Sequence, residues 1–293
     1  MTTFMPLREG FLGLDEQLAP PGAPVVRVIP FGLEATVSYG GGTHAGPAAM
    51  IAASHEIELF DEDLWREPVA EFRIETVAEP EIPAKIEDAL DMLAALTAEA
   101  LDDGAFPFVF GGEHSITPGA LRPFLDRFPD LVLLHFDAHA DLRDGYNGAR
   151  FSHAAAIRRC LDVPGLATVS VGIRSISAEE IPFYEANRDR IHIHWAKDKA
   201  DWRLDEIVAP LAGRPVYVTF DVDGFDASLM PATGTPEPGG LFWDDVMPIL
   251  KHAAEVGTFV GADVNELAPI PGLHAADFVA AKLAYKIMSA RLY

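Results

Sequence analysis

The sequence predicts one α/β domain with three layers, in which helices cover both faces of a mostly parallel sheet. Strand-like and helix-like segments alternate along the 293 residues. Several strand candidates are short, continuous apolar runs, such as residues 131–134, and such runs are typical of strands buried on both faces. No internal repeat, low-complexity tract or linker divides the chain, and a content of 49% hydrophobic residues suffices for one sizeable core.

The elements can be assigned in order along the chain. Residues 1–24 are rich in proline and glycine, and we expect an N-terminal arm that lies on the surface or reaches a neighbouring subunit, followed by the domain at residues 25–293. Apolar runs predict strands at residues 25–29, 106–110, 131–134, 167–171, 191–194, 215–221 and 258–264. Helical spacing of apolar residues predicts helices at residues 47–52, 86–101, 118–128, 152–161, 179–187, 204–211, 243–256 and 275–288.

Two of these assignments have a local reason. Pro47 suits the first turn of its helix, because that position needs no N–H donor. Ala, Leu and Met recur at helical spacing through residues 86–101, which predicts an amphipathic helix. The glycine-rich segment before Pro47 lacks both phosphate-binding signatures, so we interpret it as a structural loop.

The composition excludes several kinds of partner and environment. Lys and Arg total 22 against 45 Asp and Glu, and the formal net charge of −23 argues against nucleic acid or an anionic membrane as partner. Cys160 is the only cysteine, so no intramolecular disulfide can form. The N-terminus shows no signal-peptide pattern and no apolar stretch approaches a membrane span, so we expect a soluble, cytoplasmic protein.

The residues that follow the strand at 131–134 predict a metal site. Asp137, His139 and Asp141 stand at alternate positions, and an extended backbone directs alternate side chains to one side. Open α/β sheets bind their ligands beyond the carboxyl ends of the strands, where these side chains would converge. Taken alone, the pattern also fits a polar loop whose acids face water.

Two further strands end in residues of the same kind. Asp221 and Asp223 end the strand at 215–221, and His114 follows the strand at 106–110. The four carboxylates would balance two divalent cations, whereas a single cation would leave the cluster strongly self-repelling. Asp137 and Asp221, each at the end of its strand, can bridge the two ions.

The ligand set also indicates which metal and which chemistry to expect. Oxygen ligands with two imidazoles and no thiolate favour Mn²⁺, Mg²⁺ or Fe²⁺ over a structural zinc site. Two such ions about 3.5 Å apart hold a water between them and lower its pKa towards neutrality. The sequence therefore predicts a hydrolase.

Three segments resemble the signatures of the ureohydrolase (arginase/agmatinase) family, in the family's order. They are Gly111-Gly112-Glu113-His114-Ser115, Asp137-Ala138-His139-Ala140-Asp141, and Phe220-Asp221-Val222-Asp223-Gly224-Phe225-Asp226 with Pro231-Ala232-Thr233-Gly234-Thr235-Pro236. The resemblance extends from about residue 25 to the C-terminus. It implies an arginase-like fold, two Mn²⁺ per subunit, hydrolysis of a small guanidinium compound to urea and an amine, and a homo-oligomer, either a trimer or a hexamer. Ala140 and Ala227 replace the threonine and proline frequent in the family, but neither is a ligand.

The resemblance gives each residue of the site a role. It implies one Mn²⁺ on His114 and Asp141, the other on His139 and Asp223, and bridges from Asp137 and Asp221. His153 matches the family's proton-shuttling histidine, and Glu266 matches the glutamate that pairs with the guanidinium. These roles agree with the chemistry, because a strongly basic amine leaves only with a proton and histidine supplies one near neutral pH. A carboxylate that forks onto the planar guanidinium would hold its carbon in place for attack.

The substrate is predicted from the loop at residues 142–150. It lies between the ligands and His153 in the sequence, so we expect it to line the mouth of the pocket, with Tyr146 and Asn147 binding substrate. The loop resembles the agmatinase branch and lacks the Ser/Thr-rich stretch with which arginases hold an amino acid. Agmatine, cleaved to putrescine and urea, is therefore the predicted substrate. Arg143 and Arg150 could instead meet a carboxylate, which would suit 4-guanidinobutyrate, and an arginase-type substrate is a further alternative.

The remaining histidines have simpler interpretations. We expect His135 to support the ligands or the core, and His192 and His194 to be structural. His274 would cap a helix or lie in an interface, and the role of His44 is left open. Asp226 is expected to hydrogen-bond its own loop.

Three rival functional classes fit the sequence less well. A deacetylase of related fold would use one Zn²⁺, and the complete second ligand set argues against it. A non-catalytic descendant should have lost a ligand or His153, and none is missing. A purely structural metal site would not require His153 and Glu266.

Overall fold

The computed structural model describes residues 2–293, which contain an eight-stranded sheet in the order β2-β1-β3-β8-β7-β4-β5-β6. The strands are β1 (Val25–Phe31), β2 (Arg73–Thr76), β3 (Phe106–Gly111), β4 (Val132–Phe136), β5 (Ala167–Ile173), β6 (Ile191–Trp195), β7 (Pro215–Asp221) and β8 (Thr258–Asn265). All neighbouring strands are parallel. The predicted fold class is confirmed, and the sheet proves to be entirely parallel.

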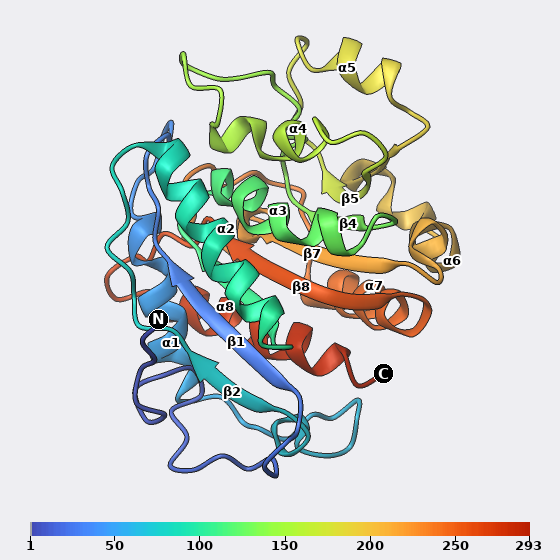
Figure 1. Cartoon of the computed structure of the whole chain (residues 1–293). Helices are drawn as coiled ribbons and strands as arrows, with labels where there is room; N and C mark the ends of the chain where they lie inside the picture. The colour runs from blue at the N-terminus through green and yellow to red at the C-terminus, as the bar shows by residue number, and fades with distance from the viewer. Residues whose placement is uncertain (1) are drawn as a thin grey trace.

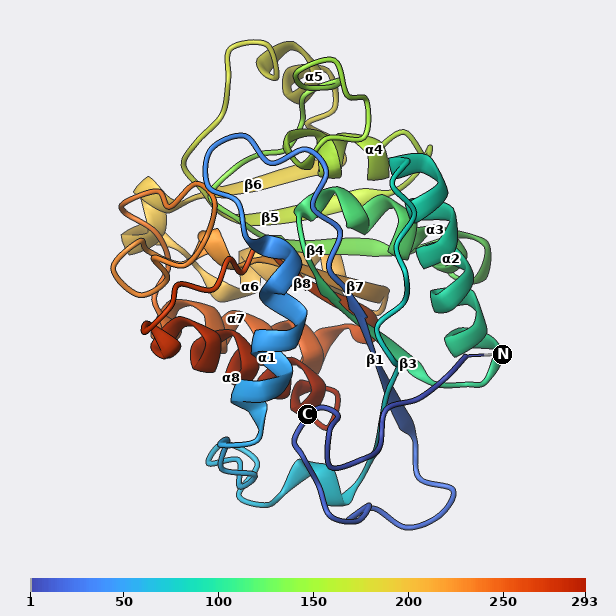
Figure 2. The same cartoon turned by 90° about the vertical axis from the view of Figure 1, so that its left-hand side faces the viewer.

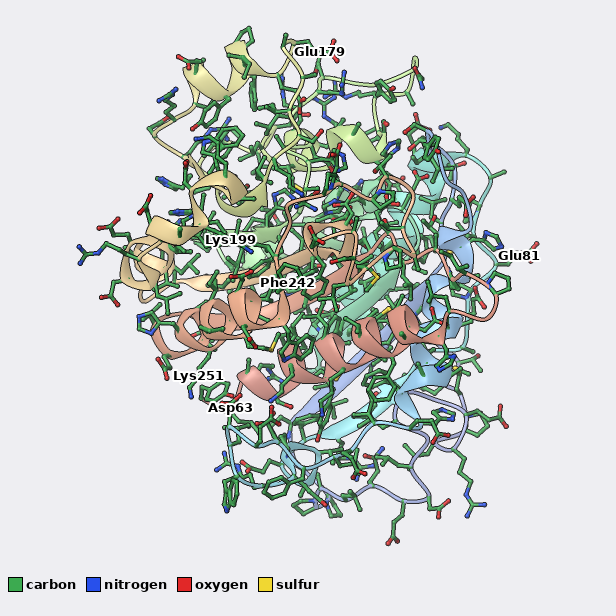
Figure 3. All side chains as sticks on the ribbon, turned by 180° about the vertical axis from the view of Figure 1, so that it is seen from behind. Asp63, Glu81, Glu179, Lys199, Phe242 and Lys251 are labelled. Atoms are coloured by element: carbon green, nitrogen blue, oxygen red, sulfur yellow. The ribbon has the colours of Figure 1, made fainter. Side chains whose placement is uncertain are left out.

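Helices cover both faces of this sheet. They are α1 (Gly46–Ser54), α2 (Ile86–Asp102), α3 (Thr117–Arg127), α4 (Ala156–Cys160), α5 (Ile181–Ala186), α6 (Leu204–Val208), α7 (Trp243–Val256) and α8 (His274–Ala290). Helices α2 and α3 lie on one face, and α1, α7 and α8 lie on the other (Figures 1 and 2). Seen from behind, α7 and α8 run side by side across the second face (Figure 3). The predicted three-layer arrangement is therefore present.

The strands divide their side chains between two cores. On β4, Val132 and Leu134 belong to the core beneath α7 and α8, whereas Leu133 belongs to the core beneath α2 and α3. All three are fully buried, as expected for a strand covered on both faces. Burial of each such side chain contributes about 1.5–3 kcal/mol, so the central strands are held firmly in place.

The structure differs from the predicted elements mainly where elements are short. The four-residue edge strand β2 was not predicted, because Arg73 and Glu75 interrupt its apolar residues and leave too few for a recognisable pattern. The helix predicted at residues 152–161 begins as a 3-10 turn (His153–Ala155) and only then becomes α4. The helix predicted at residues 204–211 likewise ends in a 3-10 turn, after α6.

Residues 2–24 lie against the domain of their own chain. Phe11, Leu12 and Leu14 are buried in the core, and the ring of Phe11 meets Phe110 of β3 edge-on at 5.1 Å. Phe4 pairs with Val77 beyond the end of β2 in an antiparallel bridge. Within residues 2–293, no helix is both long and apolar enough to span a membrane.

Candidate metal centre

A cleft of about 210 Å³ lies beyond the carboxyl ends of the central strands. The four strands that lead to the candidate ligands and Glu266, β3, β8, β7 and β4, are consecutive in the sheet although they are far apart in the sequence. Five candidate metal ligands and the predicted guanidinium-binding glutamate are among the lining residues: His114, His139, Asp141, Asp221, Asp223 and Glu266. The sheet thus brings together the segments that the sequence singled out separately.

Close contact between loops requires glycine at two positions. A Cβ atom on Gly224 would lie 2.9 Å from the backbone nitrogen of Asp137, so the loops after β4 and β7 could not approach as they do. A Cβ atom on Gly112 would lie 2.0 Å from the carbonyl oxygen of Leu33. Both glycines therefore set the spacing of the segments that carry the site.

The first group of candidate ligands surrounds His114. Its Nδ1 lies 3.2 Å from Asp137 Oδ2, 3.2 Å from Asp141 Oδ2 and 3.3 Å from Asp221 Oδ2. The second group surrounds His139, whose Nδ1 lies 2.9 Å from Asp223 Oδ2 and 3.6 Å from Asp137 Oδ1. The two oxygens of Asp137 thus face different groups, which is the arrangement that a bridging carboxylate needs.

The first group fits a metal ion. Two atoms bonded to one ion at about 2.1 Å lie roughly 3.0–3.4 Å apart at octahedral or tetrahedral angles, which matches the distances around His114. His114 Nδ1 is also buried without a hydrogen-bond partner. Its Nε2 lies 2.9 Å from the hydroxyl of Thr219, which donates its own proton to Asp263 at 2.6 Å. Nε2 therefore carries a proton, and Nδ1 points at three carboxylates, to which a shared proton or a bound metal cation would join it.

The electrostatic field of the cluster also favours cations. Burial alone would lower the pKa of His139, but Asp223 and Asp137 outweigh burial and raise it to about 12. Burial and then the charge of Asp137 raise the pKa of the Asp141 carboxyl to about 7. Burial and then the charges of Asp223 and Asp137 raise the pKa of Asp221 well above its usual value. These pKa shifts have one origin, which is the crowding of several carboxylates in a buried place. The negative charge favours protons on the histidine and on the carboxyls alike, and it would equally attract metal cations.

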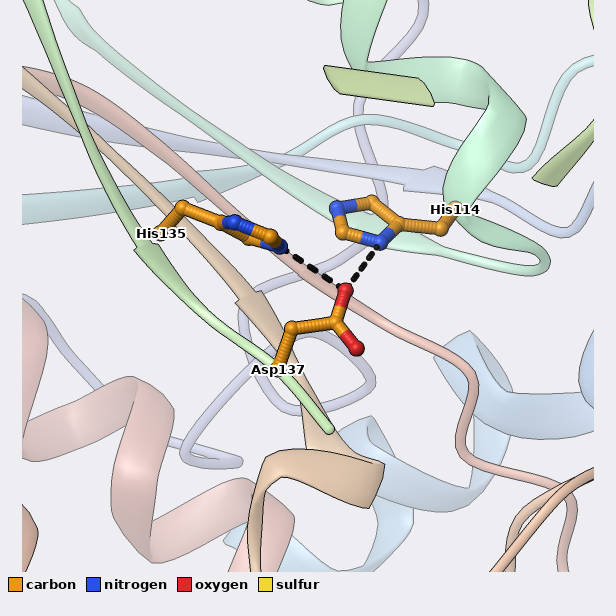
Figure 4. A group of neighbouring side chains, drawn as sticks. All are labelled: His114, His135 and Asp137. Atoms are coloured by element: carbon orange, nitrogen blue, oxygen red, sulfur yellow. Dashed lines mark hydrogen bonds and ion pairs between the residues drawn. The ribbon is translucent and has the colours of Figure 1, made fainter. Parts of the chain in front are cut away.

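His135 and His114 face the same carboxylate oxygen of Asp137 (Figure 4). His135 is fully buried, and its Nε2 lies 2.8 Å from Asp137 Oδ2 while its Nδ1 lies 3.0 Å from the hydroxyl of Ser170. With Nε2–H donated to Asp137, His135 fixes the rotation of that carboxylate. This placement agrees with the supporting role predicted for His135.

His153 and Glu266 line the same cleft. The ring of His153 lies between the hydroxyls of Thr36, 3.1 Å from Nδ1, and Ser38, 3.4 Å from Nε2. Glu266 Oε1 accepts a hydrogen bond from the backbone N–H of His114 at 2.7 Å, which ties Glu266 to the segment that carries a candidate ligand. Both predicted catalytic residues thus line the cleft that holds the candidate ligands, and Glu266 is bonded to the backbone of one of them.

Asp141 and Glu266 have backbone angles that L-amino acids seldom adopt. Their φ values are 52° and 66°, in the left-handed region, and neither residue is glycine. Such residues cost about 1–3 kcal/mol each and persist where the surrounding structure enforces them. Both residues have a carboxylate that lines the cleft. The backbone strain therefore occurs at two positions whose side chains are directed into the candidate site.

The two predicted substrate-binding residues are placed differently. Tyr146 lines the cleft, and its ring meets that of His153 edge-on at 6.1 Å. Asn147 is exposed, and it is not among the described residues that line the cleft. Asn147 and Gly148 both have positive φ values, 49° and 84°, in a tight turn closed by hydrogen bonds between Tyr146 and Ala149. The Asn-Gly pair is thus accounted for by its turn.

The residues with open roles make local ion pairs. Arg143 pairs with Glu179 and lies over the ring of Tyr146, and Arg150 pairs with Asp162 at 2.8 Å. His44 Nδ1 lies 2.8 Å from Glu34. As predicted, Asp226 accepts hydrogen bonds within its loop, from Ser228 and from the backbone of residues 239 and 240.

Comparison with known proteins places this chain in a family. A family model described as the arginase family matches residues 25–290. The chain belongs to the arginase family. The resemblance inferred from the three sequence signatures is therefore confirmed.

Its similar relatives are ureohydrolases. An N(1)-aminopropylagmatine ureohydrolase from Synechocystis sp. is 37% identical over 273 residues, which cover 90% of this chain and 88% of the relative. An agmatinase from Bacillus subtilis is 34% identical over 80% of each chain. The crystal structure of an agmatine ureohydrolase of Thermoplasma volcanium superposes with a TM-score of 0.83 at 29% identity, covering 98% of this chain and 95% of that one. This chain is thus an arginase-family ureohydrolase that is similar to agmatinases and aminopropylagmatine ureohydrolases, and the family is metal-dependent.

Several residues around the site of this arginase-family protein were not singled out from the sequence. Thr219 and Asp263 fix the tautomer of His114, and Thr36 contacts His153. Asp263 stands in the same segment as Glu266, which was the one available signal. Thr36 lies in a loop without any motif, and only its contacts reveal it.

Proposed function

We propose that this protein is a binuclear manganese hydrolase that releases urea from a guanidinoalkylamine. The observation that carries the proposal is the convergence of two ligand groups, linked by Asp137, in one cleft with His153 and Glu266. The oxygen-rich ligand set with two imidazoles suits Mn²⁺. His114 and Asp141 would hold one ion, His139 and Asp223 the other, and Asp137 and Asp221 both.

The protein's own residues would orient the substrate and move a proton. Divalent cations held by these ligands would supply the chemistry of the nucleophile, because they would lower the pKa of a bound water. Glu266 carries the carboxylate that would pair with the guanidinium and hold its carbon towards the cations. As the C–N bond breaks, His153 would give a proton to the departing amine, which leaves beside urea.

The charges around the cleft support a cationic substrate. Arg143 lines the cleft, and its guanidinium is paired with Glu179. Arg150 is paired with Asp162, so neither arginine is left to bind a substrate carboxylate. This arrangement favours agmatine or N(1)-aminopropylagmatine, which carry amines, over 4-guanidinobutyrate or arginine. The relatives from Synechocystis sp. and Bacillus subtilis, an N(1)-aminopropylagmatine ureohydrolase and an agmatinase, agree with this choice.

The test is urea release from the Mn²⁺-loaded protein with four substrates in parallel: agmatine, N(1)-aminopropylagmatine, 4-guanidinobutyrate and arginine. We expect turnover of one of the two amines, with its kcat/KM at least tenfold above that of either carboxylate. Asp137→Ala should abolish turnover and binding of the metal pair, whereas His153→Asn should slow turnover by about 10²–10⁴ with both ions retained. Preference for a carboxylate substrate would refute the charge argument, and absence of metal binding would refute the proposed function.

A further inference from the structure

We propose that Thr36, anchored by Glu113, is a positioning residue that fixes the tautomer of His153. The proton is held on Nδ1, and the lone pair stays on Nε2, which lies on the side of the cleft. This inference rests on the proposed function, in which His153 transfers the proton. It concerns a loop far from the metal signatures, since Thr36 lies 77 residues before Glu113 and 117 before His153. Neither Thr36 nor Glu113 is a candidate metal ligand.

Glu113 is an anchor that accepts hydrogen bonds on both oxygens. Its fully buried carboxylate receives the backbone N–H groups of Ala35 at 2.7 Å and Thr36 at 2.6 Å on Oε2. The hydroxyls of Ser115, at 2.5 Å, and Thr36, at 2.8 Å, reach Oε1. With donors on every side, the carboxylate acts only as an acceptor, which is the behaviour of its ionised form.

The proton of the Thr36 hydroxyl is therefore committed to Glu113. A hydroxyl has one proton, and its hydrogen bond to a carboxylate at 2.8 Å is charge-assisted, so it is stronger than a bond to a neutral imidazole nitrogen at 3.1 Å. Towards His153 the Thr36 oxygen can then only accept. It accepts the backbone N–H of His153 at 3.0 Å, and the remaining lone pair faces Nδ1.

A neutral His153 consequently carries its proton on Nδ1, because the accepting Thr36 oxygen at 3.1 Å is a closer partner than the Ser152 hydroxyl at 3.5 Å. Nε2 keeps the lone pair and faces Ser38 at 3.4 Å. Nε2 can then take a proton and later give it to the departing amine, while Nδ1–H stays bound to Thr36. In the opposite tautomer, two lone pairs would meet at Thr36 and the basic nitrogen would be turned towards the protein.

The surroundings of His153 keep the ring in this orientation. The Tyr146 ring meets it edge-on, and the backbone bond to Thr36 holds the main chain. Burial lowers the pKa of His153, and the charge of Glu113 opposes that effect. The charge of Glu113 thus favours the protonated form of His153, although the two side chains are not in contact.

Two substitutions at Thr36 separate this role from simple packing. Thr36→Val keeps the branched shape and removes the hydroxyl, whereas Thr36→Ser keeps the hydroxyl. We expect Thr36→Val to lower kcat by roughly 10–100-fold, a part of the 10²–10⁴ that acid–base catalysis contributes, with KM and bound metal unchanged. Thr36→Ser should restore kcat to within about threefold of wild type.

The tautomer itself is measured by magic-angle-spinning NMR on the protein labelled with ¹⁵N-histidine and loaded with Mg²⁺, which does not broaden the signals. The His153 signals are identified by their loss in His153→Asn. Wild type and Thr36→Ser should show protonated Nδ1 and unprotonated Nε2 when neutral, and Thr36→Val should show a mixture. An unchanged tautomer in Thr36→Val, equal losses of kcat in both variants, or loss of metal together with kcat would overturn the inference. Failure of wild type to release urea would refute the proposed function alone, because the NMR measurement needs no turnover.

Discussion

Arg174 offers a sharp test of how the candidate metal centre is held together. It follows β5 directly and donates hydrogen bonds to five backbone carbonyls at 2.7–3.1 Å. These carbonyls belong to Gly172, Asp223, Gly224, Phe225 and Glu237. One side chain therefore ties β5 to the turn that carries Asp223, a candidate ligand. Replacing it by methionine would keep an apolar stem of similar length and remove every donor.

The expected loss can be worked out from these contacts. A hydrogen bond from a charged donor contributes about 1.5–3 kcal/mol, but five acceptors share four N–H groups and their effects are not additive. We therefore expect Arg174→Met to lower the free energy of unfolding by roughly 3–5 kcal/mol, which leaves a folded protein. At about 2–4 °C per kcal/mol, Tm should fall by roughly 10 °C. Because the Asp223 backbone is released, Mn²⁺ affinity should fall by about 10–100-fold.

Arg190 provides a matched control away from the cleft. Arg190 directly precedes β6. Its Nη1 donates hydrogen bonds to the carbonyls of Leu161, Val163 and Leu166. Arg190→Met should also lower Tm but should leave Mn²⁺ affinity unchanged. Tm is measured by calorimetry on metal-free protein, and affinity by Mn²⁺ titration followed by electron paramagnetic resonance. Equal Mn²⁺ affinity in Arg174→Met, Arg190→Met and wild type would refute the coupling of Arg174 to the ligands.

Other predictions concern stability, pH and metal. Lys286→Met should cost about 3–5 kcal/mol in urea unfolding, because it leaves the buried carboxylate of Asp61 without the ammonium now 3.1 Å away; a loss below 1 kcal/mol would contradict this. Burial would raise the pKa of Asp61, but hydrogen bonds from the Leu64 backbone and Lys286 lower it below 3.8, so the pair stabilises the protein above that pH. The difference in unfolding free energy between wild type and Lys286→Met should accordingly shrink as the pH falls below 3.8, and a constant difference would count against the pair. Gly224→Ala should weaken Mn²⁺ binding in a calorimetric titration, since its Cβ would crowd the Asp137 backbone; unchanged affinity would show that the loops can separate freely. Mn²⁺ at a hundred times its Kd should raise the unfolding free energy by about 2.7 kcal/mol for each ion bound, relative to EDTA-treated protein, and no rise would exclude selective binding to the folded state.

The candidate ligands could be predicted from the sequence because their signals are local. Asp137 and Asp221 each end a buried strand, and a ligand follows two residues later in both segments. Arg174 and Thr36 could not be predicted in the same way. Their functions come from contacts with carbonyls and side chains about 50 to 117 residues away, and nothing in their own surroundings in the sequence marks them.

Two differences between expectation and structure have local physical reasons. Asn147 was assigned to substrate because its loop lies between the ligands and His153. The Asn-Gly pair is instead explained by the left-handed backbone of a two-residue turn, which both residue types tolerate. Edge strand β2 is held by pairing with β1, and that pairing is a tertiary contact with no counterpart in four residues of sequence.

The position of the site in the sheet explains how the fold tolerates it. Crowded buried carboxylates and the left-handed residues Asp141 and Glu266 oppose folding, and they would deform a loosely held loop. All the segments that carry them leave β3, β8, β7 and β4, which are consecutive inner strands of the sheet. Inner strands are hydrogen-bonded on both sides and covered on both faces. The backbone strain and the charge repulsion at the site therefore displace these strands very little. The same charges that disfavour folding of the metal-free chain attract cations once it has folded. We therefore expect the inner strands to protect their amides in hydrogen exchange with and without Mn²⁺, while only the loops at their carboxyl ends gain protection from the metal. Added protection throughout β4 and β7 would show instead that the metal is needed to assemble the sheet.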